Sequence, residues 1–184
     1  MSLDNYELMV VDELRSVVAQ TDEEEILTVC RAILKANRVF VGGAGRSGLM
    51  MKAFAMRLMH LGLSSHAVGE TITPGIEPGD LLIVGTGSGQ TRTTLATVEA
   101  GATRGARTVV ITAFPQSPIA KVADIVLYVH SPLTKPTALI ASQQPPGSLF
   151  EQCLLVLCEG MVVRLMKDLG TTEEEMRARH TKLE

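Results

Sequence analysis

The sequence contains two glycine-rich loops, and each directly follows a short apolar run. The first loop covers residues 41–48 and the second covers residues 85–91. Where a buried strand turns through glycines into a helix, the free N–H groups of the helix N-terminus can hold an anion. Both loops also carry hydroxyl groups, at Ser47, Thr86, Ser88 and Thr91. Because the loops lie on successive β–α units, we expect them to hold one anion between two strand ends.

A dinucleotide site is the first alternative for these loops. Gly43, Gly45 and Gly48 match the spacing of the dinucleotide fingerprint, and Glu70 follows where a ribose-binding acid is expected. Three features argue against a dinucleotide site. Arg46 and Ser47 lie inside the first loop, where their side chains can contact a small phosphate. The second loop repeats the hydroxyl groups, which a dinucleotide site does not require. The 184 residues also leave little room for a separate substrate domain. A small phosphorylated ligand is therefore favoured.

The pattern of apolar runs predicts a single α/β domain over residues 1–184. Strands are expected over residues 38–42, 64–68, 80–85, 107–112 and 124–129, with helices between them over 46–62, 90–104 and 117–122. The strands are rich in Val, Ile and Leu without clean alternation, which is typical of a parallel sheet buried on both faces. The sequence thus predicts a three-layer α/β/α sandwich with a five-stranded parallel, flavodoxin-like sheet.

Helices are also expected before and after this α/β core of residues 38–130. Two leading helices span 4–36, and Thr21 with Glu24 predicts a capping box for the second. They can cover the sheet or serve an oligomer interface. Residues 131–148 should form a loop, followed by a long helix over 149–168. A short charged helix over 172–182, capped by Thr172 and Glu175, closes the chain.

The long helix over 149–168 is apolar nearly all round, so it must be buried on more than one side. A subunit interface suits such a helix in a small chain. We therefore expect a homo-oligomer, with a tetramer favoured and a dimer possible.

Composition limits the classes of binding partner, and the cellular compartment, that we expect for this protein. The net charge of −3 and the lack of a basic, aromatic-rich face argue against nucleic acid. No uncharged apolar run reaches 18 residues, so we expect no membrane insertion and a cytoplasmic protein. Cys30, Cys153 and Cys158 lie in apolar surroundings and should be buried thiols. No His, Cys or carboxylate spacing suggests a metal site.

Several segments resemble the sugar isomerase (SIS) domain family, and within it the 6-phospho-3-hexuloisomerases. The resemblance is carried by residues 43–48, 53–62, 68–74, 79–83, 147–151 and 177–184. Thr86 and Gln90 depart from the usual serine and glutamate. The resemblance implies interconversion of D-arabino-hex-3-ulose 6-phosphate and fructose 6-phosphate through an enediol, after formaldehyde fixation in the ribulose monophosphate pathway. It implies no redox cofactor and no metal.

The same resemblance assigns roles to individual residues. Glu151 is the candidate base, although Ser148 and Glu151 also fit a capping box. His180 is the candidate acid for a sugar oxygen, although a histidine in a charged terminal helix is ordinarily only solvated. The tail that carries it would need a neighbouring subunit to reach a site. The candidate substrate-binding residues are Gly45, Arg46, Ser47, Thr86, Ser88 and Thr91.

Two rival functions remain open from the sequence. SIS domains also occur as sugar-phosphate sensors in regulators, but this chain carries both Glu151 and His180 and shows no DNA-binding segment. A related SIS isomerase acting on another phosphosugar is the other rival. A coupled assay that supplies the hexulose phosphate and measures fructose 6-phosphate would distinguish the expected isomerase from both rivals.

Overall fold

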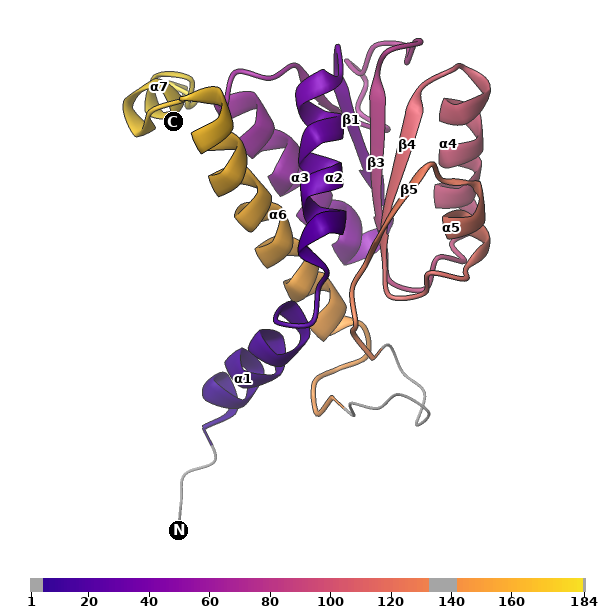
Figure 1. The fold of residues 1–184 in the computed structure, drawn as a ribbon, viewed down its shortest axis with the longest axis vertical. Helices are drawn as coiled ribbons and strands as arrows, with labels where there is room; N and C mark the ends of the chain where they lie inside the picture. Colours follow the sequence, from indigo (N-terminus) through magenta and orange to yellow (C-terminus); the bar gives the residue numbers. More distant parts are fainter. Residues whose placement is uncertain (1–4, 133–141, 184) are drawn as a thin grey trace.

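The chain forms alternating β–α units behind two leading helices (Figure 1). The structure is a computed structural model and describes residues 5–132 and 142–183. The helices are α1 (Tyr6–Val18), α2 (Glu23–Lys35), α3 (Gly45–His60), α4 (Arg92–Thr103), α5 (Pro118–Val122), α6 (Ser148–Leu169) and α7 (Glu173–Ala178). The strands are β1 (Val39–Gly43), β2 (Ser65–Ala67), β3 (Leu81–Thr86), β4 (Arg107–Thr112) and β5 (Ile125–Tyr128).

The five strands form one parallel sheet in the order β2-β1-β3-β4-β5. This confirms the predicted fold class. The chain moves outwards from β1 to β2 in one direction and from β3 to β5 in the other. In open α/β sheets, this reversal opens a crevice at the carboxyl ends of the two central strands. Here those ends are Gly43 in β1 and Thr86 in β3, which are the starts of the two glycine loops.

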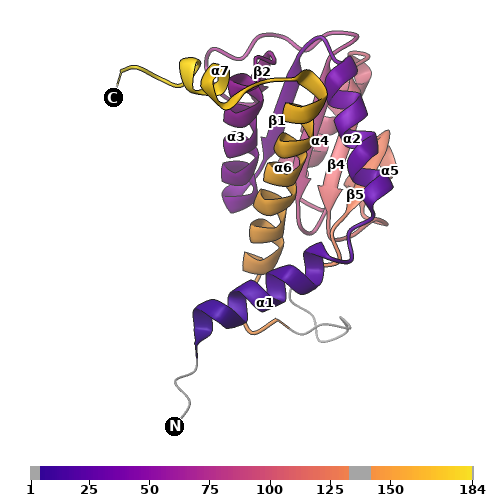
Figure 2. The same cartoon turned by 60° about the vertical axis from the view of Figure 1, so that its left-hand side comes forward.

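Helices cover both faces of the sheet, as Figures 1 and 2 show. Alternate strand residues point to opposite sides, so each face has its own apolar cluster. Val41 and Ile83 belong to the larger cluster, which packs against α2, α3 and α6. Phe40 and Leu82 belong to the smaller cluster under α4 and α5. The strands are therefore buried on both faces, as their apolar composition predicts.

The long helix α6 is enclosed on several sides. It contacts α1, α2 and α3 and buries residues along its whole length, from Leu149 to Leu165. Val156 and Val163 on its outer side remain exposed. In the described parts of the chain, no helix combines the length and apolar character that a membrane crossing needs.

Helix α1 lies across the N-terminal half of α6 and away from the sheet in both views (Figures 1 and 2). Val17 is fully buried, and Leu14 and Val18 pack beside it against the larger cluster. Of the two leading helices, only α2 covers the sheet, where Glu25 accepts a hydrogen bond of 2.8 Å from the backbone N–H of Tyr128 in the edge strand β5.

Two of the predicted helix caps are wrong. The cap of α2 is Asp22 instead of Thr21, and its carboxylate accepts the N–H groups of Glu24 and Glu25. Asp22 takes the extended backbone that a cap needs, so the helix begins one residue later. At α6, Gly147 holds the cap position with φ of +84°, which places Ser148 already inside the helix.

The remaining predicted elements agree with the structure to within a few residues. The capping box of Thr172 and Glu175 at α7 is confirmed, although that helix ends at Ala178. The predicted loop of residues 131–148 is only partly visible, because residues 133–141 lie outside the described part of the chain.

The three cysteines are free and buried, as predicted. Burial raises the pKa of Cys30 to about 11 and that of Cys153 to about 12, and it also raises the pKa of Cys158. Since the thiolate is the reactive form, the folded protein should resist a thiol reagent such as DTNB at pH 7.5. We expect three thiols to react quickly only after denaturation. Rapid labelling of a native cysteine would contradict this packing.

Candidate functional site

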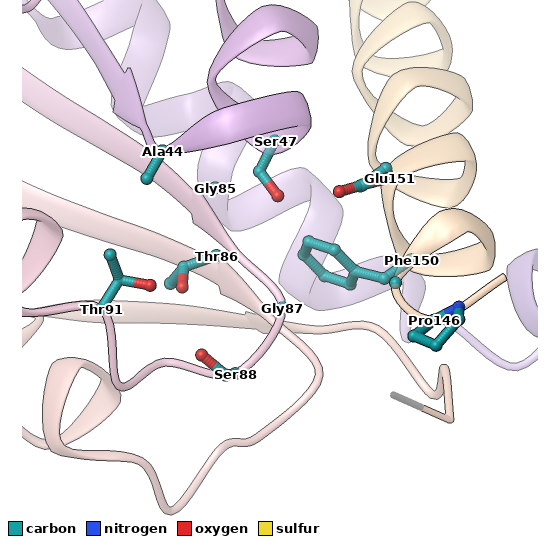
Figure 3. Close-up of a pocket in the computed structure, with 11 residues that line it drawn as sticks. Ala44, Ser47, Gly85, Thr86, Gly87, Ser88, Thr91, Pro146, Phe150 and Glu151 are labelled. Carbon is teal, nitrogen blue, oxygen red and sulfur yellow. The ribbon is translucent and has the colours of Figure 1, made fainter. Parts of the chain in front are cut away.

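A pocket of about 300 Å³ opens at the carboxyl ends of β1 and β3, where the strand order reverses. It is lined by Ala44, Ser47, Gly85, Thr86, Gly87, Ser88, Thr91, Pro146, Gly147, Phe150 and Glu151. Figure 3 shows the two loops on one side and the start of α6 on the other. The structure therefore brings five predicted site residues together, four hydroxyls and one carboxylate.

The N-termini of α3 and α4 begin at this pocket, opposite the start of α6. The cap residues are Ala44 for α3 and Thr91 for α4, and neither makes a side-chain capping hydrogen bond to the described residues. Neither first turn contains an acidic residue. The backbone N–H groups of both first turns, with the positive ends of both helix dipoles, remain available to an anion.

The loop hydroxyls are arranged to donate hydrogen bonds into the pocket. The Thr86 hydroxyl oxygen accepts the N–H of Gly89 at 3.2 Å, and that of Ser88 accepts the N–H of Gln90 at 3.3 Å. A hydroxyl that accepts from the backbone keeps its own O–H for another partner. Both oxygens can therefore stay fixed by the loop while they donate to a bound phosphate.

Close backbone approach explains why the first loop needs glycine. A Cβ atom on Gly48 would lie 2.6 Å from the carbonyl oxygen of Gly43, so the first turn of α3 sits directly against the end of β1. A Cβ atom on Gly43 would in turn lie 2.9 Å from the carbonyl oxygen of Gly85 in β3. The glycines thus hold the two strand ends and the first helix in contact.

Glu151 faces this anion site from the first turn of α6. Figure 3 shows its carboxylate directed toward Ser47. The Glu151 side chain is 17% exposed, and its Oε2 atom lies 2.7 Å from Nε of Arg46. That approach lacks hydrogen-bond geometry, and Oε2 is buried with no hydrogen-bond donor among the described residues. The carboxylate thus lies next to a cation, and its Oε2 atom accepts no hydrogen bond from the described residues.

Arg46 and Gly45 lie beside the pocket, outside its lining. The Arg46 guanidinium bridges from α3 to α6, because Nη1 also donates to the Ser148 hydroxyl at 3.4 Å. Ser148 and Glu151 therefore interact with Arg46 and do not form the predicted capping box. Gly147 holds the cap position in a left-handed conformation and has no side chain with which to cap the helix.

His180 lies at the other end of α6, far from Glu151 in the same chain. A helix of 22 residues spans about 33 Å, and α7 follows its C-terminal end. There the His180 ring stacks on the ring of His60 at 5.1 Å, and Arg179 donates to the His60 carbonyl oxygen at 3.0 Å. Burial, together with the charges of His180 and Arg57, lowers the pKa of His60. The structure does not bring His180 into its own pocket.

Comparison with known proteins identifies the domain. Residues 32–155 match the model of the SIS domain. The chain belongs to the SIS domain family. A 3-hexulose-6-phosphate isomerase from Mycobacterium gastri is 41% identical over 96% of this chain and 88% of its own. The enzyme of that name from Bacillus subtilis is 38% identical over the whole of both chains.

The comparison with solved structures gives a match of the same kind as the comparison of sequences. A hypothetical protein from Methanococcus jannaschii is 31% identical, and a molecular function of 3-hexulose-6-phosphate isomerase was inferred from its structure. It superimposes with a TM-score of 0.84 over 97% of this chain and 99% of that one. The match therefore covers α1 and α7, which lie outside the part of the chain that the SIS model matches.

The pocket also contains residues that the sequence motifs do not mark as site residues. Pro146, Gly147 and Phe150 form its wall at the start of α6. The turn residues Pro145-Pro146-Gly147 ahead of the apolar helix are a signal that could have marked this wall. Among residues 5–132 and 142–183, no group of three His, Cys, Asp or Glu side chains is placed to hold a metal ion.

The loop geometry predicts how the SIS pocket binds phosphate. Ser88→Ala removes a hydroxyl that can donate to a charged group, a loss of about 1.5–3 kcal/mol, so the Kd for inorganic phosphate should rise at least tenfold. The Kd is measured by titration with inorganic phosphate followed by ³¹P NMR. The control is Thr103→Ala, at the far end of α4. Unchanged Kd values in Ser47→Ala, Ser88→Ala and Thr91→Ala would rule out this phosphate site.

Proposed function

We propose that this protein interconverts D-arabino-hex-3-ulose 6-phosphate and fructose 6-phosphate. The observation that carries the proposal is the pairing, across one pocket, of two anion-binding loops with the half-buried carboxylate of Glu151. The relatives named 3-hexulose-6-phosphate isomerases support the same reaction, since they match over nearly the whole chain. In this proposal the loops hold the phosphate and the sugar chain extends toward α6.

The reaction moves a carbonyl group between two adjacent carbons. Glu151 removes the proton from C2 of the 3-ketose, the electrons form the C2–C3 double bond, and O3 takes a proton. The resulting enediol then loses the proton of O2, and Glu151 returns its proton to C3. One carboxylate can serve both carbons because they are neighbours. Binding the phosphate fixes the sugar against this base, which replaces a random encounter by a held geometry.

The residues around Glu151 support this role in different ways. Ser47, Thr86, Ser88 and Thr91 would donate to the phosphate oxygens. Arg46 would hold the Glu151 carboxylate in place and add positive charge at the mouth of the site. Gly45, in the first turn of α3, would offer its backbone N–H.

The proton transfers between sugar oxygens need a further group, and we assign them to His180 of a neighbouring subunit. Its ring is exposed and lies at the opposite end of α6 from its own pocket. A homo-oligomer would bring it to another site, and a tetramer is favoured over a dimer. Exposed apolar side chains on the outer sides of α3 and α6 support such an assembly, namely Leu49, Met56, Met59, Val156 and Val163.

A coupled assay tests the proposed reaction. Ribulose 5-phosphate, formaldehyde and the partner synthase supply the hexulose phosphate, and fructose 6-phosphate is measured. Wild-type protein should form it, and Glu151→Gln should lower kcat by about 10²-fold or more because the amide cannot accept the carbon proton. Glu159→Gln, on the same helix, is the matched control and should retain activity. Failure of the wild-type protein to form fructose 6-phosphate would refute the function.

A mixing experiment tests the shared site. Glu151→Gln and His180→Ala subunits should each be nearly inactive, and deletion of residues 178–184 should also abolish activity while the core stays folded. In mixed oligomers, some sites would combine an intact Glu151 with an intact His180, so partial activity should return. Absence of recovery in verified mixed oligomers would refute sharing between subunits.

A further inference from the structure

The carboxylate of Glu13 on α1 binds the segment of residues 142–144, which leads into the pocket. Glu13 accepts three hydrogen bonds from residues 142–144. The Ser142 hydroxyl donates to Oε2 at 2.7 Å, the Gln143 backbone N–H donates to Oε1 at 2.9 Å, and the Gln144 side-chain amide donates to Oε2 at 3.0 Å. Both carboxylate oxygens are used, so the contact sets the direction of the segment as well as its distance from α1.

The connection from this contact to the pocket is short and stiff. Pro145 and Pro146 follow directly, and proline fixes one backbone dihedral angle at each position. The Ser148 N–H then donates to the Pro145 carbonyl oxygen at 3.0 Å, and the Glu151 N–H donates to that of Gly147 at 3.1 Å. A shift of the segment held by Glu13 would therefore be passed on to the pocket wall and the first turn of α6.

Helix α1 is itself well anchored for this purpose. Val17 is fully buried, and Leu14, next to Glu13, packs against the same apolar cluster. Burial opposes ionisation of Glu13, but the hydrogen bonds from Gln143, Ser142 and Gln144 outweigh it and lower its pKa. The carboxylate is thus charged at neutral pH, the form in which it accepts all three hydrogen bonds.

We propose that Glu13 is a positioning residue for the active site, which holds the pocket wall at Pro146 and Gly147 and so aims Glu151. The part of this inference that concerns turnover rests on the proposed function. Through Glu13, α1 would contribute to the site, although α1 precedes the stretch of residues 32–155 that matches the SIS model.

Phosphate binding and proton transfer should respond differently to the loss of Glu13. The phosphate loops follow β1 and β3 and have no contact with residues 142–144 in the hydrogen bonds of the described chain. Glu151 lies in the first turn of α6, shortly after the segment of residues 142–144 that Glu13 holds. Loss of Glu13 should therefore lower kcat while the Kd for inorganic phosphate stays the same, which a general loss of stability would not do.

The test compares Glu13→Ala, Glu13→Gln and Asp12→Ala in the full-length protein. Alanine is a good helix former, so α1 should persist when it replaces Glu13. Glutamine keeps one acceptor oxygen and should give an intermediate effect. Asp12 is the exposed neighbour with no hydrogen bond or ion pair to the described residues, and its variant is the control. Hydrogen exchange of peptides covering residues 142–151 and steady-state kinetics in the coupled assay are measured.

In Glu13→Ala we expect amide exchange at residues 142–148 to quicken roughly tenfold or more, while exchange in β1 and β3 is unchanged. We expect kcat to fall about 10- to 100-fold, as for a base displaced by about 1 Å. Unchanged exchange at residues 142–148, an equal effect in Asp12→Ala, or a matching loss of phosphate binding would each overturn the inference. If wild-type protein makes no fructose 6-phosphate, the proposed function fails, and the exchange and phosphate measurements still decide the role of Glu13.

Discussion

The reversal of strand order between β1 and β3 is the constraint on which the site depends. It places the carboxyl ends of these strands at a crevice and directs the first turns of α3 and α4 toward it. Because neither N-terminus has a side-chain cap within the described residues, two helix dipoles and two sets of N–H groups face one small volume. Glycines at positions 43 and 48 allow this approach, since any side chain there would meet backbone.

The second half of the site comes from the opposite side of the pocket. Helix α6 is held by apolar contacts with α1, α2 and α3, and its first turn presents Glu151 to the anion site. Buried apolar surface therefore sets the distance between Glu151 and the two glycine loops, and polar contacts join Arg46 to Glu151 and Glu13 to the segment ahead of α6.

The sequence predicted what depends on local pattern. The apolar strands and the glycine turns marked the sheet and both glycine loops of the pocket, and the family resemblance marked Glu151, which lines the same pocket. Cap positions were less predictable, because whether Thr21 or Asp22 caps α2 depends on the backbone angles of one residue. Two features depend on tertiary packing alone: the stacking of His180 on His60, and the contact of Glu13 with a segment 129 to 131 residues away.

In the proposed reaction, this pocket moves a carbonyl group from C3 to C2 of a phosphorylated ketose by means of Glu151. It can be tested by following the carbon itself. Ribulose 5-phosphate labelled with ¹³C at C2 condenses with formaldehyde to give hexulose phosphate labelled at the C3 carbonyl. After wild-type protein is added, ¹³C NMR should show the label as an alcohol carbon, and with Glu151→Gln it should remain the C3 carbonyl carbon over the same time. A label that stays at the carbonyl with wild-type protein would refute the proposed reaction, and one that moves equally fast with Glu151→Gln would refute Glu151 as the base.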